Sequence, residues 1–147
     1  MNQVTLIQDT REPSESWNMY FSSPCVIQTL KTGDFSVLGM DDLVAVERKS
    51  MNDFLGSLTS SRARFERELQ RATDLEFFAV LIEGSYGDFE AGLYRSKMHP
   101  NSAWESVAAL EVRYRCPFYF MESQRQAAHK AESLLLKFAR EKTKMRL

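Results

Sequence analysis

Residues 77–82 read FFAVLI, and this stretch constrains the fold of the chain more than any other. It has the length of a β-strand but lacks the alternation of a strand that has one face in water. Continuous apolar runs of this length are typical of central strands in sheets that are covered on both faces. The run therefore predicts an α/β domain with helices on each side of a sheet.

Short strand signals fill the first third of the chain. Residues 4–8 read VTLIQ, and residues 25–39 read CVIQTLKTGDFSVLG, which predicts a strand, a turn near Gly33 and Asp34, and a second strand. Residues 43–49 (LVAVERK) predict another strand, and residues 14–21 a short helix. We expect the strands in residues 25–49 to form an antiparallel meander.

Helices dominate the remainder of the chain. Ser50 and Asp53 have the spacing of a capping box, and apolar residues at near-helical spacing continue to Ala72, with a break expected at residues 59–61. Residues 94–102 predict a loop. Further helices are expected from capping boxes at Ser102–Glu105 and Ser123–Gln126, with a strand over residues 117–121 between them. This order predicts a central mixed sheet flanked by α-helices.

The composition is that of one globular domain, which we expect to span residues 1–147. The chain is 44% hydrophobic and 27% charged, with a net charge of -1. That charge argues against a protein that binds polyanions through many basic contacts, although clustered carboxylates can mask a local basic surface. Cys25 and Cys116 form no CxxC pair, which favours a reducing compartment and no zinc site. The longest apolar run is too short for a membrane span, and the N-terminus lacks the pattern of a signal peptide.

The clearest candidate chemistry lies in the strand at residues 43–49. Side chains alternate across a strand, so Glu47 and Lys49 share one face and Arg48 points to the other. A carboxylate that holds Mg²⁺ beside an ammonium suits hydrolysis of a phosphodiester, because the metal activates water and the lysine stabilises the oxyanion. Asp34 is the natural second ligand if its hairpin pairs with this strand. Taken alone, the Glu47–Lys49 pair is more often an ordinary ion pair on a solvated edge.

The segment GDFSVLGMDDLVAVERKSMND, residues 33–53, resembles the GD…ERK-x-x-x-D signature of the XPF-type nuclease domains. These domains belong to the restriction-endonuclease-like PD-(D/E)xK class. DTREP, residues 9–13, looks like the first acidic motif of that family, and GSLTSSRARFERELQRA is similar to its following helix. The resemblance covers nearly the whole chain and is nearest to compact phage and bacterial members.

The resemblance implies a functional role for each matched residue. It assigns Mg²⁺ or Mn²⁺ to Asp34 and Glu47, and catalysis to Lys49. The residues that it adds to the catalytic site are Asp9, Glu12, Arg48 and Asp53. It also brings Arg62 and Arg64 near the DNA backbone. Helix-hairpin-helix and helicase regions, which larger members carry, do not fit into 147 residues.

Other interpretations of single residues stay open. Asp53 also serves the capping box, and Arg48 can pair with Asp53 or with the turn at Asp9, placing acids instead of touching substrate. Arg67 and Arg71 fit an exposed helix face with i,i+4 pairs. Arg95 and Lys97 precede a helix start and are weak candidates for phosphate contact. His99 is more simply a structural residue, and Trp17 and Tyr20 are core residues or stack on an unpaired base.

We therefore expect a metal-dependent DNA endonuclease that acts on branched, fork or flap structures, as a homodimer that uses the apolar stripe of the last helix. The expected location is the cytoplasm, at the nucleoid or in a host cell if the chain is phage-encoded. The alternative is a non-catalytic DNA-binding or dimerisation module with a nuclease-like fold. Such modules lose the acidic residues, whereas this chain keeps Asp34, Glu47 and Lys49. A nuclease that acts on single strands or RNA would use the same chemistry.

Overall fold

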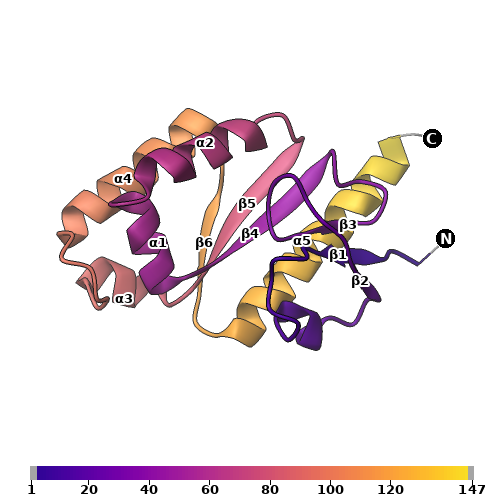
Figure 1. Ribbon diagram of the computed structural model, residues 1–147, viewed down its shortest axis with the longest axis horizontal. Coiled ribbons are helices and arrows are strands. Elements are labelled where there is room, and N and C mark those ends of the chain that lie inside the picture. Colours follow the sequence, from indigo (N-terminus) through magenta and orange to yellow (C-terminus); the bar gives the residue numbers. More distant parts are fainter. Residues whose placement is uncertain (1–2, 146–147) are drawn as a thin grey trace.

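The computed structural model describes residues 3–145 and shows a mixed six-stranded sheet between two layers of helices (Figure 1). The strands are β1 (Leu6–Gln8), β2 (Cys25–Ile27), β3 (Phe35–Val37), β4 (Val44–Ser50), β5 (Phe77–Glu83) and β6 (Phe118–Met121). The helices are the 3-10 helix η1 (Trp17–Tyr20) and the α-helices α1 (Met51–Leu58), α2 (Arg62–Ala72), α3 (Tyr86–Ala91), α4 (Pro100–Tyr114) and α5 (Gln124–Met145). The predicted fold class is confirmed.

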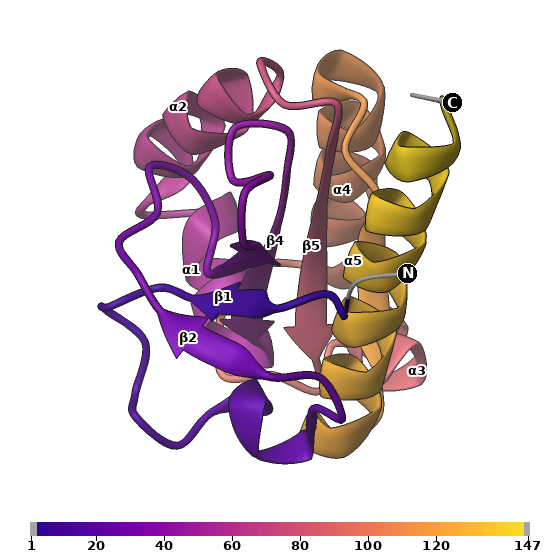
Figure 2. The same cartoon turned by 90° about the vertical axis from the view of Figure 1, so that its right-hand side faces the viewer.

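The strand order is β2-β1-β3-β4-β5-β6. Strand β3 runs antiparallel to β1 and β4, whereas β1 with β2, β4 with β5, and β5 with β6 are parallel pairs. The expected meander is therefore wrong, because β1 lies between β2 and β3. Figure 2 shows β1 and β2 side by side. Leu6 and Ile7 of β1 are fully buried, whereas Ile27 of β2 is 62% exposed, so burial of the more apolar strand outweighs the local turn signal.

Both faces of the central strand β5 are covered, as its apolar run predicts. Its residues Phe78, Val80 and Ile82 belong to a core shared with α1, α2 and α4. Ala79 and Leu81 point to the opposite core, which α5 and η1 cover. The apolar stripe of α5, with residues such as Ala131 and Leu135, is buried in this second core. It is therefore not free to form a dimer interface, contrary to expectation.

Two of the three predicted capping boxes, at Ser50 and Ser123, precede a helix. The Ser50 hydroxyl accepts from the Asp53 N–H, and α1 and α2 are separated at the expected break. The start predicted at Ser102 is wrong: α4 begins at Pro100, and Nδ1 of His99 accepts from the Asn101 N–H at 3.1 Å. Proline favours the first helical position, which explains the earlier start.

Helix α3 was not predicted, although its sequence carries a capping signal. The Ser85 hydroxyl accepts from the Asp88 N–H at 3.0 Å, and Gly92 ends the helix with φ of 75°. The helix has only six residues, too few for a periodic apolar pattern to stand out.

A buried carboxylate of α5 ties the N-terminal part of the chain to the last helix. Glu132 is 6% exposed and accepts hydrogen bonds from the backbone N–H groups of Ser22 and Ser23, at distances of 2.8–3.1 Å. Trp17 in η1 is fully buried and stacks on Phe35 with ring centroids 5.1 Å apart. Trp17 therefore cannot stack on a base.

Cys25 and Cys116 are free cysteines. Among residues 3–145, no helix combines the length and the apolar character that crossing a membrane requires.

Candidate active site

Asp34 is held beside Glu47 by the antiparallel pairing of β3 and β4. Phe35 pairs with Val46 on this antiparallel ladder, so Asp34 lies opposite Glu47. The Asp34 N–H donates to the Val46 carbonyl, and the Arg48 N–H donates to Oδ2 of Asp34, both at 2.8 Å. The strand pairing thus fixes the position of this carboxylate from both sides.

Gly33 allows the chain to reach β4 just before Asp34. Its φ is 85°, and an added Cβ would lie 2.8 Å from the Cβ of Ala45 and 3.1 Å from the Val46 carbonyl oxygen. Glycine adopts this backbone conformation without the steric cost that other residues meet. The Gly-Asp pair therefore combines a close backbone approach with a carboxylate.

Glu47 lies opposite Asp34 on the ladder and is buried, with 7% exposure. Burial raises its pKa well above the ordinary value, and the negative charges of Asp34 and Glu68 raise it further. Burial also raises the pKa of Asp34 to about 6, with contributions from the charges of Glu12 and Glu68. A nearby cation would stabilise the ionised form of these two acids and lower their pKa values.

Lys49 lies on the same face of β4 as Glu47, as strand alternation predicts. Its Nζ is 3.6 Å from Oε2 of Glu47 and 5.4 Å from the ring centroid of Phe65 in α2. The ammonium is therefore held at the acidic cluster by a carboxylate and an aromatic ring.

Two adjoining hollows open at this end of β4. One, of about 280 Å³, includes Lys49, Ser57 and Arg64 in its lining. The other, of about 210 Å³, is lined by residues of the acidic turn, Gly33 and Asp34. Glu47, Glu68 and Arg71 border both hollows, so they lie where the two meet.

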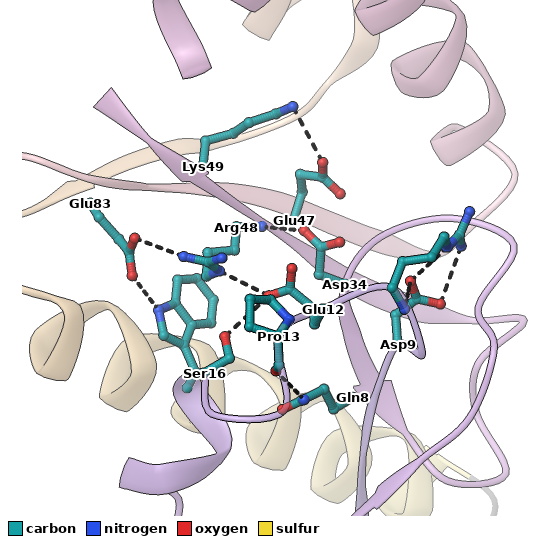
Figure 3. A network of polar contacts seen from close by, with 12 residues as sticks. Gln8, Asp9, Glu12, Pro13, Ser16, Asp34, Glu47, Arg48, Lys49 and Glu83 are labelled. Carbon is teal, nitrogen blue, oxygen red and sulfur yellow. Dashed lines mark hydrogen bonds and ion pairs between the residues drawn. The ribbon is translucent and has the colours of Figure 1, made fainter. Parts of the chain in front are cut away.

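Arg48 points to the opposite face and joins four elements (Figure 3). Its Nε donates to Glu12 at 2.8 Å, and a terminal nitrogen donates to Glu83 at 3.0 Å. The other oxygen of Glu83 accepts from the Trp17 indole at 2.7 Å, and Glu12 accepts from the Ser16 hydroxyl. Arg48 therefore places Glu12, and it pairs with the acidic turn through Glu12 but not with Asp53.

Asp9 organises the acidic turn. It is 2% exposed and accepts from the Arg11 guanidinium and from the Leu30 N–H, each at 2.8 Å. Burial acts to raise the pKa of Asp9, but these hydrogen bonds outweigh burial and lower it. Asp9 is thus an ionised carboxylate that is already satisfied by protein donors.

The remaining predicted residues are scattered. Asp53 is exposed in the first turn of α1 and borders neither hollow. Arg62 pairs with Glu66 at 3.0 Å and donates to Ser106, so it is held within the fold, whereas Arg64 borders the larger hollow. The exposed Arg95 and Lys97 border neither hollow.

Glu68 is a site residue that sequence reasoning missed. It lies on α2 between the buried Phe65 and Ala72, at i+3 and i−4 from them, so helical periodicity already places it at the edge of the apolar stripe. An acid in that position is the signal that was available. Glu83, Lys31 and Arg71 were likewise not predicted at the site.

The donor set suits Mg²⁺ or Mn²⁺. These are hard cations that take oxygen ligands, and Mg²⁺ is often held by one or two carboxylates and several waters. Asp34 and Glu47 supply two such groups. Burial is the main cause of the raised pKa of each, and neighbouring negative charge, which a cation would offset, adds to it. Within residues 3–145, no three His, Cys, Asp or Glu side chains are grouped so as to hold a metal ion by themselves.

The mixed sheet between two layers of helices, with acids at the end of β4, defines an α/β domain. A sequence profile of the ERCC4 domain matches residues 8–134. The chain therefore belongs to the ERCC4 domain family, the XPF-type nuclease domains, which confirms the resemblance.

Solved structures agree on the fold. XPF from Aeropyrum pernix is 23% identical with a TM-score of 0.71, over 89% of this chain and 59% of that one. XPF from the same organism in complex with DNA is 21% identical with a TM-score of 0.72, over 95% and 66% of the respective chains.

A sequence relative is much longer than this chain. It comes from Methanocaldococcus jannaschii, is assigned by its name to the ATP-dependent RNA helicases, and is 24% identical over 136 residues. The match spans 92% of this chain but only 15% of the relative. This chain thus corresponds to a small part of that protein.

Proposed function

We propose that this chain is a divalent-metal-dependent endonuclease that hydrolyses DNA phosphodiester bonds. The observation that carries the proposal is the pairing of Asp34 with Glu47 across the β3–β4 ladder, where Glu47 borders both the hollow of Asp34 and the adjoining hollow of Lys49. A charge-bearing cluster of this kind is costly to bury, and its acids have raised pKa values. Perturbed acids in a hollow favour a functional site over an ordinary ion pair.

Asp34 and Glu47 would hold Mg²⁺ or Mn²⁺. The ion supplies Lewis-acid polarisation of the phosphate and lowers the pKa of a bound water. Lys49 orients water or stabilises charge that develops on the phosphoryl oxygens, because its ammonium is fixed at the same end of β4. Arg48 orders Glu12 and donates its backbone N–H to Asp34, so it positions the acids from behind. Asp9 fixes the acidic turn through Arg11 and Leu30.

The proposed substrate is DNA with a branch, fork or flap. The family membership supports a nuclease, and the similar XPF fold occurs in a complex with DNA. The hollows are bordered by exposed cations beside the acids. The free cysteines fit a reducing compartment such as the cytoplasm.

We further infer a homodimer that uses the surface of α3, α4 and β6. Tyr86 is 45% exposed and Trp104 is 40% exposed, and their rings are in edge contact at 5.5 Å between centroids. They border a largely apolar hollow of about 280 Å³ beside the edge strand β6. Sedimentation of the wild type and of a Trp104→Glu variant tests this inference, since a charge at the interface should yield monomers.

The experiment that tests the nuclease is a cleavage assay on labelled fork, flap, duplex and single-stranded DNA, with Mg²⁺ or Mn²⁺. Wild type is compared with Asp34→Asn and Glu47→Gln, and calorimetry measures metal binding by each protein. We expect the wild type to cut and bind metal, and the two variants to lose both. Intact cleavage by Glu47→Gln would overturn the assignment, and an inactive wild type without metal binding would favour the non-catalytic module.

A further inference from the structure

We propose that Lys31 and Arg71, together with Arg64, bind successive phosphates of one nucleic-acid strand and lead it across the two hollows. This inference rests on the proposed function, and it assigns the substrate track rather than the metal site. Lys31 and Arg71 match no motif that pointed to DNA, and Arg71 reads in the sequence as part of a solvated helix face.

The first support is position. Lys31 borders the hollow that contains Asp34, Arg64 borders the hollow that contains Lys49, and Arg71 borders both. The three cations therefore follow the order Lys31, Arg71, Arg64 along the connected hollows. Glu47 and Glu68 lie at the same junction as Arg71, so a phosphate bound by Arg71 would be next to the acids.

The second support is that these charges are available. Five cations border the hollows, and two of them are neutralised by carboxylates: Arg11 by Asp9 at 2.8 Å and Lys49 by Glu47 at 3.6 Å. Within residues 3–145, the side chains of the other three have no ion pair or hydrogen bond, and all three are exposed. By contrast, Arg62 is held by Glu66 and Ser106.

The third support is the charge balance. The net charge of the chain is -1, and the hollows carry several carboxylates, so a polyanion is repelled unless local cations offset them. Phosphate contacts by Lys and Arg supply the affinity of sequence-independent binding. Exposed cations at the border of the acidic hollows are where that affinity must arise.

The test measures salt-dependent binding, separately from cleavage. Fluorescence anisotropy with a labelled DNA fork and with a labelled single strand is recorded from about 50 to about 200 mM salt, where phosphate contacts dominate the dependence. All proteins carry Asp34→Asn, so the DNA stays intact. Lys31→Gln and Arg71→Gln are compared with Lys142→Gln, a charge-matched control whose ammonium is engaged by Glu76 at 2.7 Å.

We expect each of the two test variants to reduce the slope of log K against log salt by about 0.7 on the single strand. On the fork, which has duplex and single-stranded parts, the reduction should be about 0.7–0.9. The double variant should lose about twice as much, and the control should leave the slope unchanged. An RNA strand of the same sequence should show a similar loss, because the contacts are to phosphate.

Unchanged slopes in both variants, or a loss equal to that of the control, would overturn the proposal. A loss on DNA but not on RNA would overturn the assignment to phosphate. Thermal unfolding of each variant checks that binding losses do not reflect unfolding. The experiment measures binding and not cleavage. If the variants reduce the salt dependence but the wild type never cleaves DNA, the proposed phosphate contacts stand and the proposed hydrolysis is refuted.

Discussion

Replacing Asp34 by asparagine should stabilise the folded protein at neutral pH while it abolishes the proposed hydrolysis. Burial, together with the charges of Glu12 and Glu68, raises the pKa of Asp34 from 3.8 to about 6. The amide oxygen of asparagine can still accept from the Arg48 N–H, which now donates to Oδ2. The substitution thus removes an unfavourable charge and keeps the hydrogen bond.

The magnitude follows from the pKa shift. A rise from 3.8 to about 6 is roughly two units, and each unit corresponds to about 1.4 kcal/mol. Ionising Asp34 therefore costs about 3 kcal/mol more in the folded protein than in the unfolded chain. Since the folded state holds the proton more tightly, the cost is absent well below pH 3.8, grows toward pH 6 and is complete above it.

Thermal unfolding followed by circular dichroism, with EDTA present, measures this effect between acidic and neutral pH. A difference of about 3 kcal/mol corresponds to a gain of roughly 6–12 °C in the melting temperature of a chain of this size. The gain should be absent well below pH 3.8, grow between pH 3.8 and about 6, and be complete above that range. Saturating Mg²⁺ should stabilise the wild type and leave the variant unchanged, since only binding to the folded state shifts stability.

The matched control is Asp53→Asn. Asp53 is exposed in the first turn of α1, where a negative charge favours the helix, so its loss should cost about 0.3–1 kcal/mol. A variant at Asp34 that is no more stable than the wild type at neutral pH would refute the reasoning, as would an equal gain at acidic pH.

Three further outcomes are expected. Gly33→Ala should destabilise the protein by about 2 kcal/mol or more in urea unfolding. A residue with a Cβ costs about 1–2 kcal/mol in the left-handed conformation, and the added Cβ would also lie only 2.8 Å from the Cβ of Ala45. A neutral effect would contradict the described backbone. Glu83→Gln should lower the cleavage rate, because Arg48 loses one of its two carboxylate partners. Metal affinity in calorimetry should stay unchanged, because Asp34 and Glu47 stay in place. Rescue by Glu83→Asp would be consistent with a positioning role. Glu132→Ala should lower the free energy of unfolding by about 2 kcal/mol, because charge-assisted hydrogen bonds to Ser22 and Ser23 are lost; Glu141→Ala, on the exposed part of the same helix, is the control and should change it little.

Much of the architecture was predictable because it depends on local patterns. The FFAVLI run indicated a strand covered on both faces, and β5 has helices on each side. The order of the N-terminal strands was not predictable in this way. Nothing local to β1 and β2 shows that they pair in parallel across the segment that carries η1, since that pairing depends on burial in the complete sheet.

The candidate site was likewise predictable only in part. Alternation along β4 correctly separates Glu47 and Lys49 from Arg48, because a strand has a fixed period. The partners of those side chains come from elements that are distant in the sequence: Glu83 from β5 and Glu68 from α2. Sequence spacing within one strand cannot identify them, although the position of Glu68 beside an apolar stripe was a usable signal.

The contact of Glu132 with the loop before β2 has a consequence for the order in which the chain is made. Ser22 and Glu132 are 110 positions apart, and the loop that this carboxylate holds follows the acidic turn. At translation rates of about 5–20 residues per second, that interval takes roughly 5–20 s. We therefore expect a nascent chain to carry Asp9, Asp34 and Glu47 for several seconds before the helix that braces its first third exists. The proposed hydrolysis would then be confined to finished molecules.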